Sequence, residues 1–289
     1  MIHIPGIVTI GELPSIQVAK EIKHELDLKQ WPVIADITSM LRNLYPRFDL
    51  TSITPKQIIH IGGPLTSRYI LNWMESHTSV DHCHLRIKNR PFNPFGAKQR
   101  IIHGLELLQR TEESSNLPIL TIEPNSMSKF ICDLTQLAIA SKAAIFCGNS
   151  LSIRYFDEYY PQVQSFVPLY ASRGASGIDG QIATIAGLAT GLKSPVIAMI
   201  GDLTLLHDCN SLALLKQSEY PIILVVLNNN GGGIFERLPH LKRINDFDKY
   251  VKTPHNLNLE RVVTGFNLTY DRQLPQKLTQ TVVIERVEA

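Results

Sequence analysis

The chain contains the stretch Pro195-Val-Ile-Ala-Met-Ile-Gly-Asp202, an apolar run that stops at a glycine and a carboxylate. A second apolar run, residues 221–227, stops at the polar stretch Asn228-Asn-Asn-Gly231. Continuous apolar runs of this length are typical of parallel strands that are buried on both faces. If the two strands pair, Asp202 and Asn229 approach each other, because parallel strands place their carboxyl ends at one edge of a sheet.

The same alternation of apolar runs and helical patterns extends from this stretch towards both ends of the chain. Further strands are expected over residues 7–10, 31–37, 57–61, 80–87, 143–147, 167–170 and 281–285, and helices over residues 16–26, 65–75 and 181–192. Strands that alternate with helical patterns predict right-handed crossovers and a parallel sheet. The fold class expected is therefore α/β, with two open parallel-sheet (βαβ) domains.

The length of 289 residues fits two domains. Prolines punctuate residues 89–128, and a boundary is expected near residues 115–127. We therefore expect a first domain over residues 1–120 and a second over residues 121–289.

Composition excludes several classes of protein. Lys and Arg number 28 against 26 Asp and Glu, a net charge of +2 that indicates neither a nucleic-acid partner nor a membrane-surface partner. A hydrophobic content of 44% excludes a disordered chain. The four cysteines form no CxxC pair and the N-terminal stretch has no signal-peptide pattern, so a cytoplasmic protein with reduced thiols is expected.

Oxygen donors follow the two strongest strands. Asp202, Asn229 and a turn carbonyl such as that of Gly231 would form a hard-oxygen site. Mg²⁺ takes few protein ligands and completes its shell with phosphates and water, so this spacing predicts a metal that holds a diphosphate. The glycine-rich stretch 173–180 precedes the expected helix 181–192 and would leave N–H groups facing an anion at the helix N-terminus. Each of these patterns taken singly is more often only a turn.

Taken together and in order, the stretches 172–180, 201–204 and 228–235 resemble the thiamine diphosphate-dependent enzymes. The wordings Arg173-Gly-Ala-Ser-Gly-Ile-Asp-Gly180 and Asn228-Asn-Asn-Gly-Gly-Gly-Ile-Phe235 are similar, more narrowly, to the menaquinone-pathway synthases (MenD), which make 2-succinyl-5-enolpyruvyl-6-hydroxy-3-cyclohexene-1-carboxylate. The resemblance continues through residues 147–154 and thins towards residues 31–36 and 62–66, so it covers nearly the whole chain.

The resemblance implies a role for each matching position. It implies metal ligands at Asp202, Asn229 and Gly231, and cofactor-binding positions at Ser176, Gly177, Ile178, Leu203 and Thr204. It implies catalytic-pocket positions at Ile234, Phe235 and Leu238, and substrate-binding positions at Ser150, Arg154, Arg173 and Arg68. In the family, residues 1–120 correspond to a central Rossmann-like domain and residues 121–289 to the diphosphate-binding domain.

The resemblance also implies the reaction and its components. The cofactors would be thiamine diphosphate and Mg²⁺ or Mn²⁺, and the substrates 2-oxoglutarate and isochorismate. This transferase reaction decarboxylates 2-oxoglutarate on the cofactor and adds the resulting carbanion to isochorismate. Both substrates are dianions, which suits paired arginines because a guanidinium binds a carboxylate through two parallel hydrogen bonds. An oligomer, a homodimer or tetramer, and a cytoplasmic or plastid-stromal location are expected.

Two departures from the family pattern accompany the resemblance. No counterpart is found for the pyrimidine-binding domain or for its glutamate, which activates the cofactor, and the family's Lys-Arg pair stands here as Ser67-Arg68. We therefore expect either one half of a split enzyme, acting with a separately supplied pyrimidine-binding domain, or an inactive truncated product.

Other interpretations stay open. The chain could be a non-catalytic cofactor-binding module, or another thiamine diphosphate decarboxylase or ligase of the acetolactate synthase type, although Arg173 and the triple asparagine argue against the latter. Residues 81–84, Asp-His-Cys-His, could suggest a metal site but favour a plain outer strand, because successive strand residues point to opposite faces. His207 fits a structural role at least as well as a catalytic one, and Asp179 could cap the helix that begins near Gln181.

Overall fold

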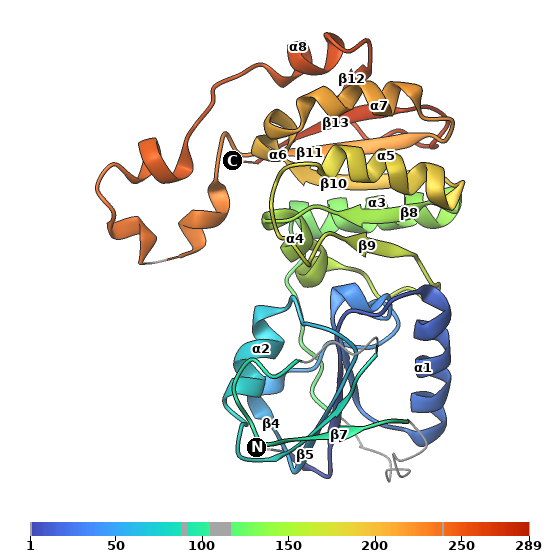
Figure 1. The fold of residues 1–289 in the computed structure, drawn as a ribbon, viewed down its shortest axis with the longest axis vertical. Coiled ribbons are helices and arrows are strands. Elements are labelled where there is room, and N and C mark those ends of the chain that lie inside the picture. The colour runs from blue at the N-terminus through green and yellow to red at the C-terminus, as the bar shows by residue number, and fades with distance from the viewer. Residues whose placement is uncertain (1, 88–91, 105–116, 239, 289) are drawn as a thin grey trace. The chain divides into compact units, whose positions relative to one another are not determined.

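The computed structural model describes residues 2–87, 92–104, 117–238 and 240–288, and it consists of two compact units (Figure 1). The first unit comprises Met1–Lys129 and Asp157–Phe166, and the second comprises Phe130–Phe156 and Val167–Ala289. The segment 157–166 therefore belongs to the first unit although it lies in the second half of the sequence. Asn43 Nδ2 fixes it by donating to the carbonyl oxygens of Val163 and Ser165, at 3.0 and 2.6 Å. The expected division into residues 1–120 and 121–289 has a single boundary and therefore does not include the return of residues 157–166 to the first unit.

The first unit is built on a five-stranded parallel sheet in the order β3-β2-β5-β6-β7. Its strands are β2 (Ile7–Ile10), β3 (Val33–Ala35), β5 (Gln57–Ile61), β6 (Asp81–Leu85) and β7 (Gln99–Ile102). The helices α1 (Ile16–Lys29) and α2 (Arg68–Glu75) lie on opposite sides of this sheet (Figure 1). A separate two-stranded sheet pairs β1 (Ile2–Ile4) with β4 (Ile53–Pro55).

The second unit is built on a six-stranded parallel sheet in the order β12-β13-β11-β10-β8-β9. Its strands are β8 (Ala144–Cys147), β9 (Leu169–Ala171), β10 (Val196–Gly201), β11 (Ile222–Asn228), β12 (Thr269–Asp271) and β13 (Val282–Val287). Its helices are α3 (Ser126–Ser141), α4 (Leu151–Tyr159), α5 (Gln181–Leu192), α6 (Asp202–His207), α7 (Leu212–Gln217) and α8 (Leu259–Thr264). Parallel pairing throughout both large sheets confirms the predicted α/β fold class.

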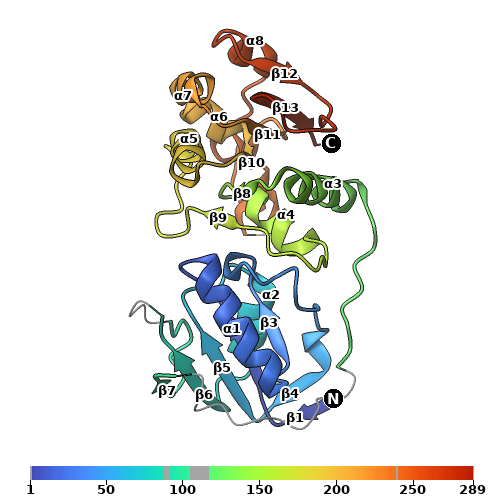
Figure 2. The same cartoon turned by 90° about the vertical axis from the view of Figure 1, so that its right-hand side faces the viewer.

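Helices cover both faces of the second sheet, which explains its continuous apolar strands. Figure 2 shows α5 and α7 on one face and α3 on the other. In β10, Val196, Ala198 and Ile200 belong to the same core cluster as residues of α5 and α7. Ile197 and Met199 point to the opposite face and are equally buried, at 1% exposed each. Both halves of the strand alternation are therefore apolar.

Carboxylates lie at the end of β3 and at the break between α6 and α7. The strand expected over residues 31–37 is only β3, because Asp36 ends it by accepting the N–H of Thr38 at 3.0 Å and starting a 3₁₀ turn. The crossover 203–220 forms α6 and α7 with a 3₁₀ turn between them, at Asp208, whose Oδ1 accepts from Ser211 Oγ at 2.6 Å. Within the proline-punctuated stretch 89–128, residues 89–91 and 105–116 lie outside the described residues, and these include the first two positions of the expected boundary at 115–127.

The histidine-rich strand β6 is an inner strand, and its prediction as an outer strand was wrong. β7 pairs with it on its far side, and the short, partly charged sequence of β7 gave no strand signal. His82 Nε2 bonds to the carbonyl of His77 and His84 Nε2 to that of Gly62, both at 2.9 Å. In the described part of the chain there is no group of three or more His, Cys, Asp or Glu side chains placed to hold a metal ion.

Two further observations concern the cysteines and the length of the helices. The four cysteines are free thiols, two of them buried. Among the described residues, no helix combines the length and apolar character that a bilayer crossing requires.

Candidate functional site

The carboxyl ends of β10 and β11 meet at one edge of the second sheet. The two strands pair in parallel with Gly201 opposite Leu227, so Asp202 and Asn229 leave the sheet side by side, as predicted. A cavity of about 330 Å³ opens at this edge. It is lined by Asn149, Ser150, Leu151, Ser152, Arg154, Arg173, Ser176, Ile178, Gly201, Asp202, Leu203, Thr204, Leu227, Asn229, Gly231, Gly232, Gly233, Ile234 and Phe235.

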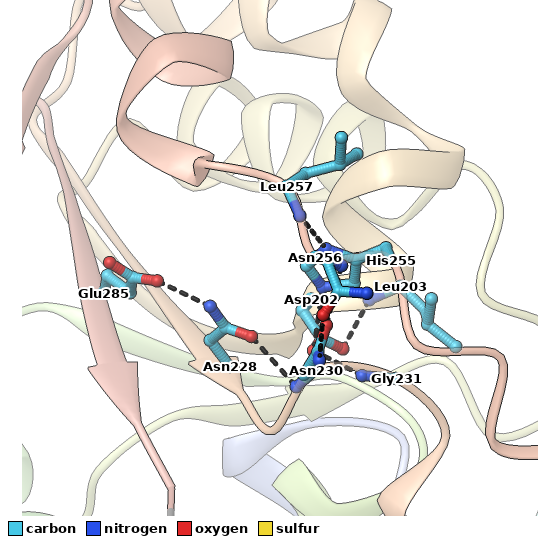
Figure 3. Close-up of polar contacts among 9 residues, drawn as sticks. All are labelled: Asp202, Leu203, Asn228, Asn230, Gly231, His255, Asn256, Leu257 and Glu285. Atoms are coloured by element: carbon cyan, nitrogen blue, oxygen red, sulfur yellow. Dashed lines mark hydrogen bonds and ion pairs between the residues drawn. The ribbon is translucent and has the colours of Figure 1, made fainter. Parts of the chain in front are cut away.

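Asp202 is a buried carboxylate with three hydrogen-bond donors. It is 1% exposed, and its Oδ1 accepts the N–H of Leu203 at 2.6 Å. Its Oδ2 accepts the N–H of Gly231 at 2.9 Å and lies 3.2 Å from His255 Nε2. Figure 3 draws these residues around the carboxylate. Three partners from three directions fix the plane of the carboxylate while lone pairs remain for a further ligand.

Asn229 presents an acceptor that nothing in the described chain uses. Its Oδ1 is buried and has no hydrogen-bond partner among the described residues. Its side chain also hydrogen-bonds to Glu288, a carboxylate whose pKa is raised above its ordinary value by burial. A buried amide oxygen without a partner costs free energy, which a ligand at this oxygen would recover. A carboxylate and an amide oxygen at one cavity edge are donors that suit a hard divalent cation.

Gly231 is required for its backbone shape. Its φ of +131° lies outside the range of other residues, and an added Cβ would lie 2.3 Å from the carbonyl oxygen of Lys252. Its N–H serves Asp202, and its carbonyl oxygen accepts the N–H of Gly233 at 3.0 Å. The predicted carbonyl ligand therefore has one internal partner already and one lone pair left.

The first turn of α5, which follows the stretch where an anion site is expected, has an acidic partner within the chain. Asp208 Oδ2 accepts the N–H groups of Ile182 and Ala183, at 2.6 and 3.2 Å, so the first turn of α5 is already capped by a carboxylate. Gly180 is the N-cap residue, without a side-chain cap, so Asp179 does not take the capping role considered for it. Asp208 reaches the start of α5 because the chain turns at this residue between α6 and α7. The sequence did not predict this cap, because no local pattern connects Asp208 to α5.

The cavity gathers most of the residues singled out from the sequence. These are Ser150, Arg154, Arg173, Ser176, Ile178, Asp202, Leu203, Thr204, Asn229, Gly231, Ile234 and Phe235. Arg173 Nη1 donates to Asn149 Oδ1 at 2.9 Å, and Arg154 Nη1 to the carbonyl oxygen of Ser150 at 2.6 Å.

Three predicted site residues do not line the cavity. The carbonyl oxygen of Gly177 accepts from Asn149 Nδ2 and Gln181 Nε2, at 2.8 and 2.7 Å, so this residue supports the loop. Leu238 follows the short helix η5 (Gly233–Arg237) and is 38% exposed. Arg68 is an exposed residue at the start of α2, in the other unit.

Three residues that contact the site were not singled out from the sequence, Asn149, His255 and Glu288, and neither was Asp208, which caps α5. Each acts through a hydrogen bond to a distant residue, as His255 does to Asp202. Asn149 lies inside the stretch 147–154 that carries the resemblance, and that signal could have found it. No motif marks Asp208, His255 or Glu288, because their spacing from the motif residues depends on the path of the chain and not on a local pattern.

The geometry of this edge can be set beside known proteins. Residues 154–283 match the family described as thiamine pyrophosphate enzyme, C-terminal TPP binding domain. Over these residues the chain is similar to that thiamine pyrophosphate-binding domain. The matched residues include the predicted metal positions Asp202, Asn229 and Gly231 and the polar end of the cavity at Arg173.

Relatives that match most of the chain carry the name 2-succinyl-5-enolpyruvyl-6-hydroxy-3-cyclohexene-1-carboxylate synthase. The chain is 29% identical over 294 residues to the synthase of Yersinia pestis bv. Antiqua (strain Angola), a match that covers 92% of this chain and 51% of that protein. The synthase of Yersinia pseudotuberculosis serotype O:1b (strain IP 31758) matches to the same extent, 29% over 294 residues with the same two coverages. The chain thus spans about half the length of the curated relatives it matches.

Proposed function

We propose that this chain provides the metal and diphosphate site of a thiamine diphosphate-dependent transferase of the MenD type. The proposed reaction decarboxylates 2-oxoglutarate and adds the resulting four-carbon unit to isochorismate in menaquinone or phylloquinone biosynthesis. The observation that carries the proposal is the pair formed by Asp202 and the unpartnered Asn229 Oδ1, at the edge of a cavity inside a thiamine pyrophosphate-binding domain. The identity to the synthases supports the choice of substrates.

The residues present fit a divalent cation and a diphosphate. Asp202 and Asn229, with the carbonyl oxygen of Gly231, would hold Mg²⁺ or Mn²⁺. Ser176, Ile178, Leu203 and Thr204 line the same cavity and would face the diphosphate and the thiazolium side of thiamine diphosphate. The cofactor, when bound, supplies the electron sink for decarboxylation of a 2-oxo acid.

The chain's own side chains bind and orient the substrates in this proposal. Arg154 and Arg173 bring two guanidinium groups to the cavity, where they would bind the carboxylates of the dianionic substrates. Asn149 orients Arg173, because its Oδ1 accepts from Arg173 Nη1. Ile234 and Phe235 form an apolar wall that would exclude water from the reacting atoms.

A glutamate for the aminopyrimidine side of the cofactor would come from a pyrimidine-binding domain outside residues 1–289, in a longer chain or in a partner chain of an oligomer. Assay of residues 1–289 alone with 2-oxoglutarate and isochorismate tests this part. We expect no product; product formation by this chain alone would contradict it.

The cofactor site is tested by calorimetric titration of the purified chain with thiamine diphosphate and Mg²⁺. We expect saturable binding that Asp202→Ala abolishes, because the substitution removes the only charged donor of the proposed metal site. Asp271→Ala, which removes an exposed carboxylate of β12 in the same unit, is the control and should bind as the unchanged chain does. Absence of binding by the unchanged chain would refute the proposed function, and undiminished binding by Asp202→Ala would refute the metal site.

An enzyme of the acetolactate synthase type is the second candidate, since the pair Gly201-Asp202 and the asparagines of β11 suit it as well. The presence of Arg154 and Arg173 in the cavity favours dicarboxylate substrates and hence the MenD-type reaction. The chain could instead be a non-catalytic module that only binds the cofactor. In that case, replacing Arg173 would not change the turnover of the completed enzyme, meaning this chain combined with a pyrimidine-binding domain.

A further inference from the structure

His255 reaches the proposed metal site from 53 positions away in the sequence. Its Nδ1 accepts the N–H of Leu257 at 3.0 Å, which requires a lone pair on that nitrogen. The ring proton therefore lies on Nε2, where it is donated to Asp202 Oδ2 at 3.2 Å. The two side chains are 8% and 2% exposed, so this contact is shielded from water.

The segment that carries His255 is fixed to the turn after β11. Asn230 Nδ2 donates to Asn256 Oδ1 and the N–H of Asn256 donates to Asn230 Oδ1, both at 2.8 Å. The N–H of Asn230 in turn donates to Asn228 Oδ1, and Asn228 Nδ2 donates to Glu285 Oε1 (Figure 3). This continuous set of amide contacts, from β13 through the turn to residue 256, gives the imidazole a single position relative to Asp202.

Asp202 depends on His255 for its orientation. Leu203 and Gly231 donate to it from the backbone on either side of the cavity edge. Without the imidazole, Oδ1 would keep its donor from Leu203 and Oδ2 only that from Gly231, so the carboxylate would be held less firmly against rotation about its last side-chain bond. Partners of metal-ligating carboxylates fix such rotation, and losing one typically weakens metal binding by about 10–100-fold.

We propose that His255 is a positioning residue that orients the Asp202 carboxylate for the divalent cation. The inference rests on the proposed function, since it presupposes that Asp202 binds the metal. The role belongs to the Nε2 donor and not to the local contact between Nδ1 and Leu257.

Two substitutions separate these two ring nitrogens. In His255→Gln the side-chain amide nitrogen occupies the place of Nε2, so the donor to Asp202 is kept and the acceptor for Leu257 is lost. In His255→Asn the amide oxygen occupies the place of Nδ1, so the acceptor for Leu257 is kept and the donor to Asp202 is lost. The two variants are similar in polarity and differ in which contact survives.

The test measures the dissociation constant of Mn²⁺ by calorimetry in the presence of saturating thiamine diphosphate. We expect His255→Gln to stay within about threefold of the unchanged chain and His255→Asn to bind at least about tenfold more weakly. The thermal unfolding midpoint of each variant, measured without metal, shows that a weaker affinity does not come from an unfolded second unit.

Each result decides the matter. Equal Mn²⁺ affinity in both variants, or weaker binding by His255→Gln than by His255→Asn, overturns the positioning role while leaving the proposed function standing. An unchanged chain that binds no Mn²⁺ with thiamine diphosphate overturns the proposed function, and the role of His255 falls with it.

Discussion

Asp36 in the first unit and Asp202 in the second occupy the same place in their folds. Each directly follows or ends a buried parallel strand, β3 or β10, and each is at most 1% exposed. Asp36 accepts four hydrogen bonds, from the N–H and hydroxyl of Thr38 and from the N–H groups of Thr66 and Ser67. Asp202 accepts three and stands beside the unpartnered Asn229 Oδ1 at the cavity edge.

The comparison shows that position at a strand end does not by itself make a ligand site. The carboxylate of Asp36 joins the loop at Thr38 to the loop at residues 66–67, and its four hydrogen bonds are all made within the chain. The carboxylate of Asp202 instead lies beside the unpartnered Asn229 Oδ1 and faces the cavity. The surroundings of the carboxylate, more than its burial or its strand, separate the structural aspartate from the proposed metal ligand. The following predictions test that contrast.

The largest effect is expected from Asp36→Ala. Leaving four buried donors without a partner should lower the free energy of unfolding by about 3–5 kcal/mol. Both tryptophans, Trp31 and Trp73, lie in the first unit, so their fluorescence during urea unfolding reports on that unit alone. The folded variant should keep its affinity for thiamine diphosphate and Mn²⁺. Loss of that affinity would contradict the view that Asp36 is purely structural and that only Asp202 binds the metal.

Gly231→Ala should damage the site of Asp202. The added Cβ meets the carbonyl oxygen of Lys252 at 2.3 Å, and moving the backbone displaces the N–H that Asp202 accepts. We expect a loss of about 1–3 kcal/mol in unfolding free energy and weaker Mn²⁺ binding, measured by circular dichroism and calorimetry.

The matched control for that substitution is Gly187→Ala in α5, where an added Cβ meets nothing within 4 Å. This change should stabilise the helix by about 0.5–1 kcal/mol without changing Mn²⁺ affinity. Equal effects of the two substitutions would show that the shape of the turn at Gly231 is not needed.

Arg173→Lys should separate substrate from cofactor at the same edge. Lysine keeps the charge and loses the planar pair of N–H donors, so the KM for 2-oxoglutarate in the completed enzyme should rise about tenfold. Cofactor and Mn²⁺ affinity should not change. If both affinities fell together, Arg173 would belong to the cofactor site.

A separate effect concerns how the stability of the first unit depends on pH. Burial, and then the neighbouring His84, lower the pKa of His60 from 6.5 to about 3. Below pH 6.5 the unfolded chain takes up a proton that the folded chain refuses, so stability is full above that pH and falls as the pH drops towards 3. The slope from one such group is about 1.4 kcal/mol per pH unit.

His60→Gln should flatten that slope. Urea unfolding followed by tryptophan fluorescence at pH 7 and pH 5 measures it, and the site around Asp202 should be unaffected. An identical slope in the variant would assign the pH dependence to other groups, such as His84, whose pKa burial also lowers.

The sequence predicted those features that local patterns determine. The apolar runs before Gly201 and Asn228 were enough to predict two paired parallel strands, and the pairing placed Asp202 beside Asn229. The contacts made by His255, Asp208 and Glu288 could not be predicted, since each joins residues brought together only by the folded path of the chain. β7 was missed because Gln99 and Arg100 make half of it polar.

The return of residues 157–166 to the first unit has a consequence for modularity. The chain passes from one unit to the other three times, after residues 129, 156 and 166, so no single cut separates two self-contained pieces. A fragment of residues 121–289 would carry residues 121–129 and 157–166 of the first unit, and partners of the second segment, Asn43 among them, would stay behind. Exchange of the second unit between proteins, by recombination or by engineering, therefore has to include the first unit as well.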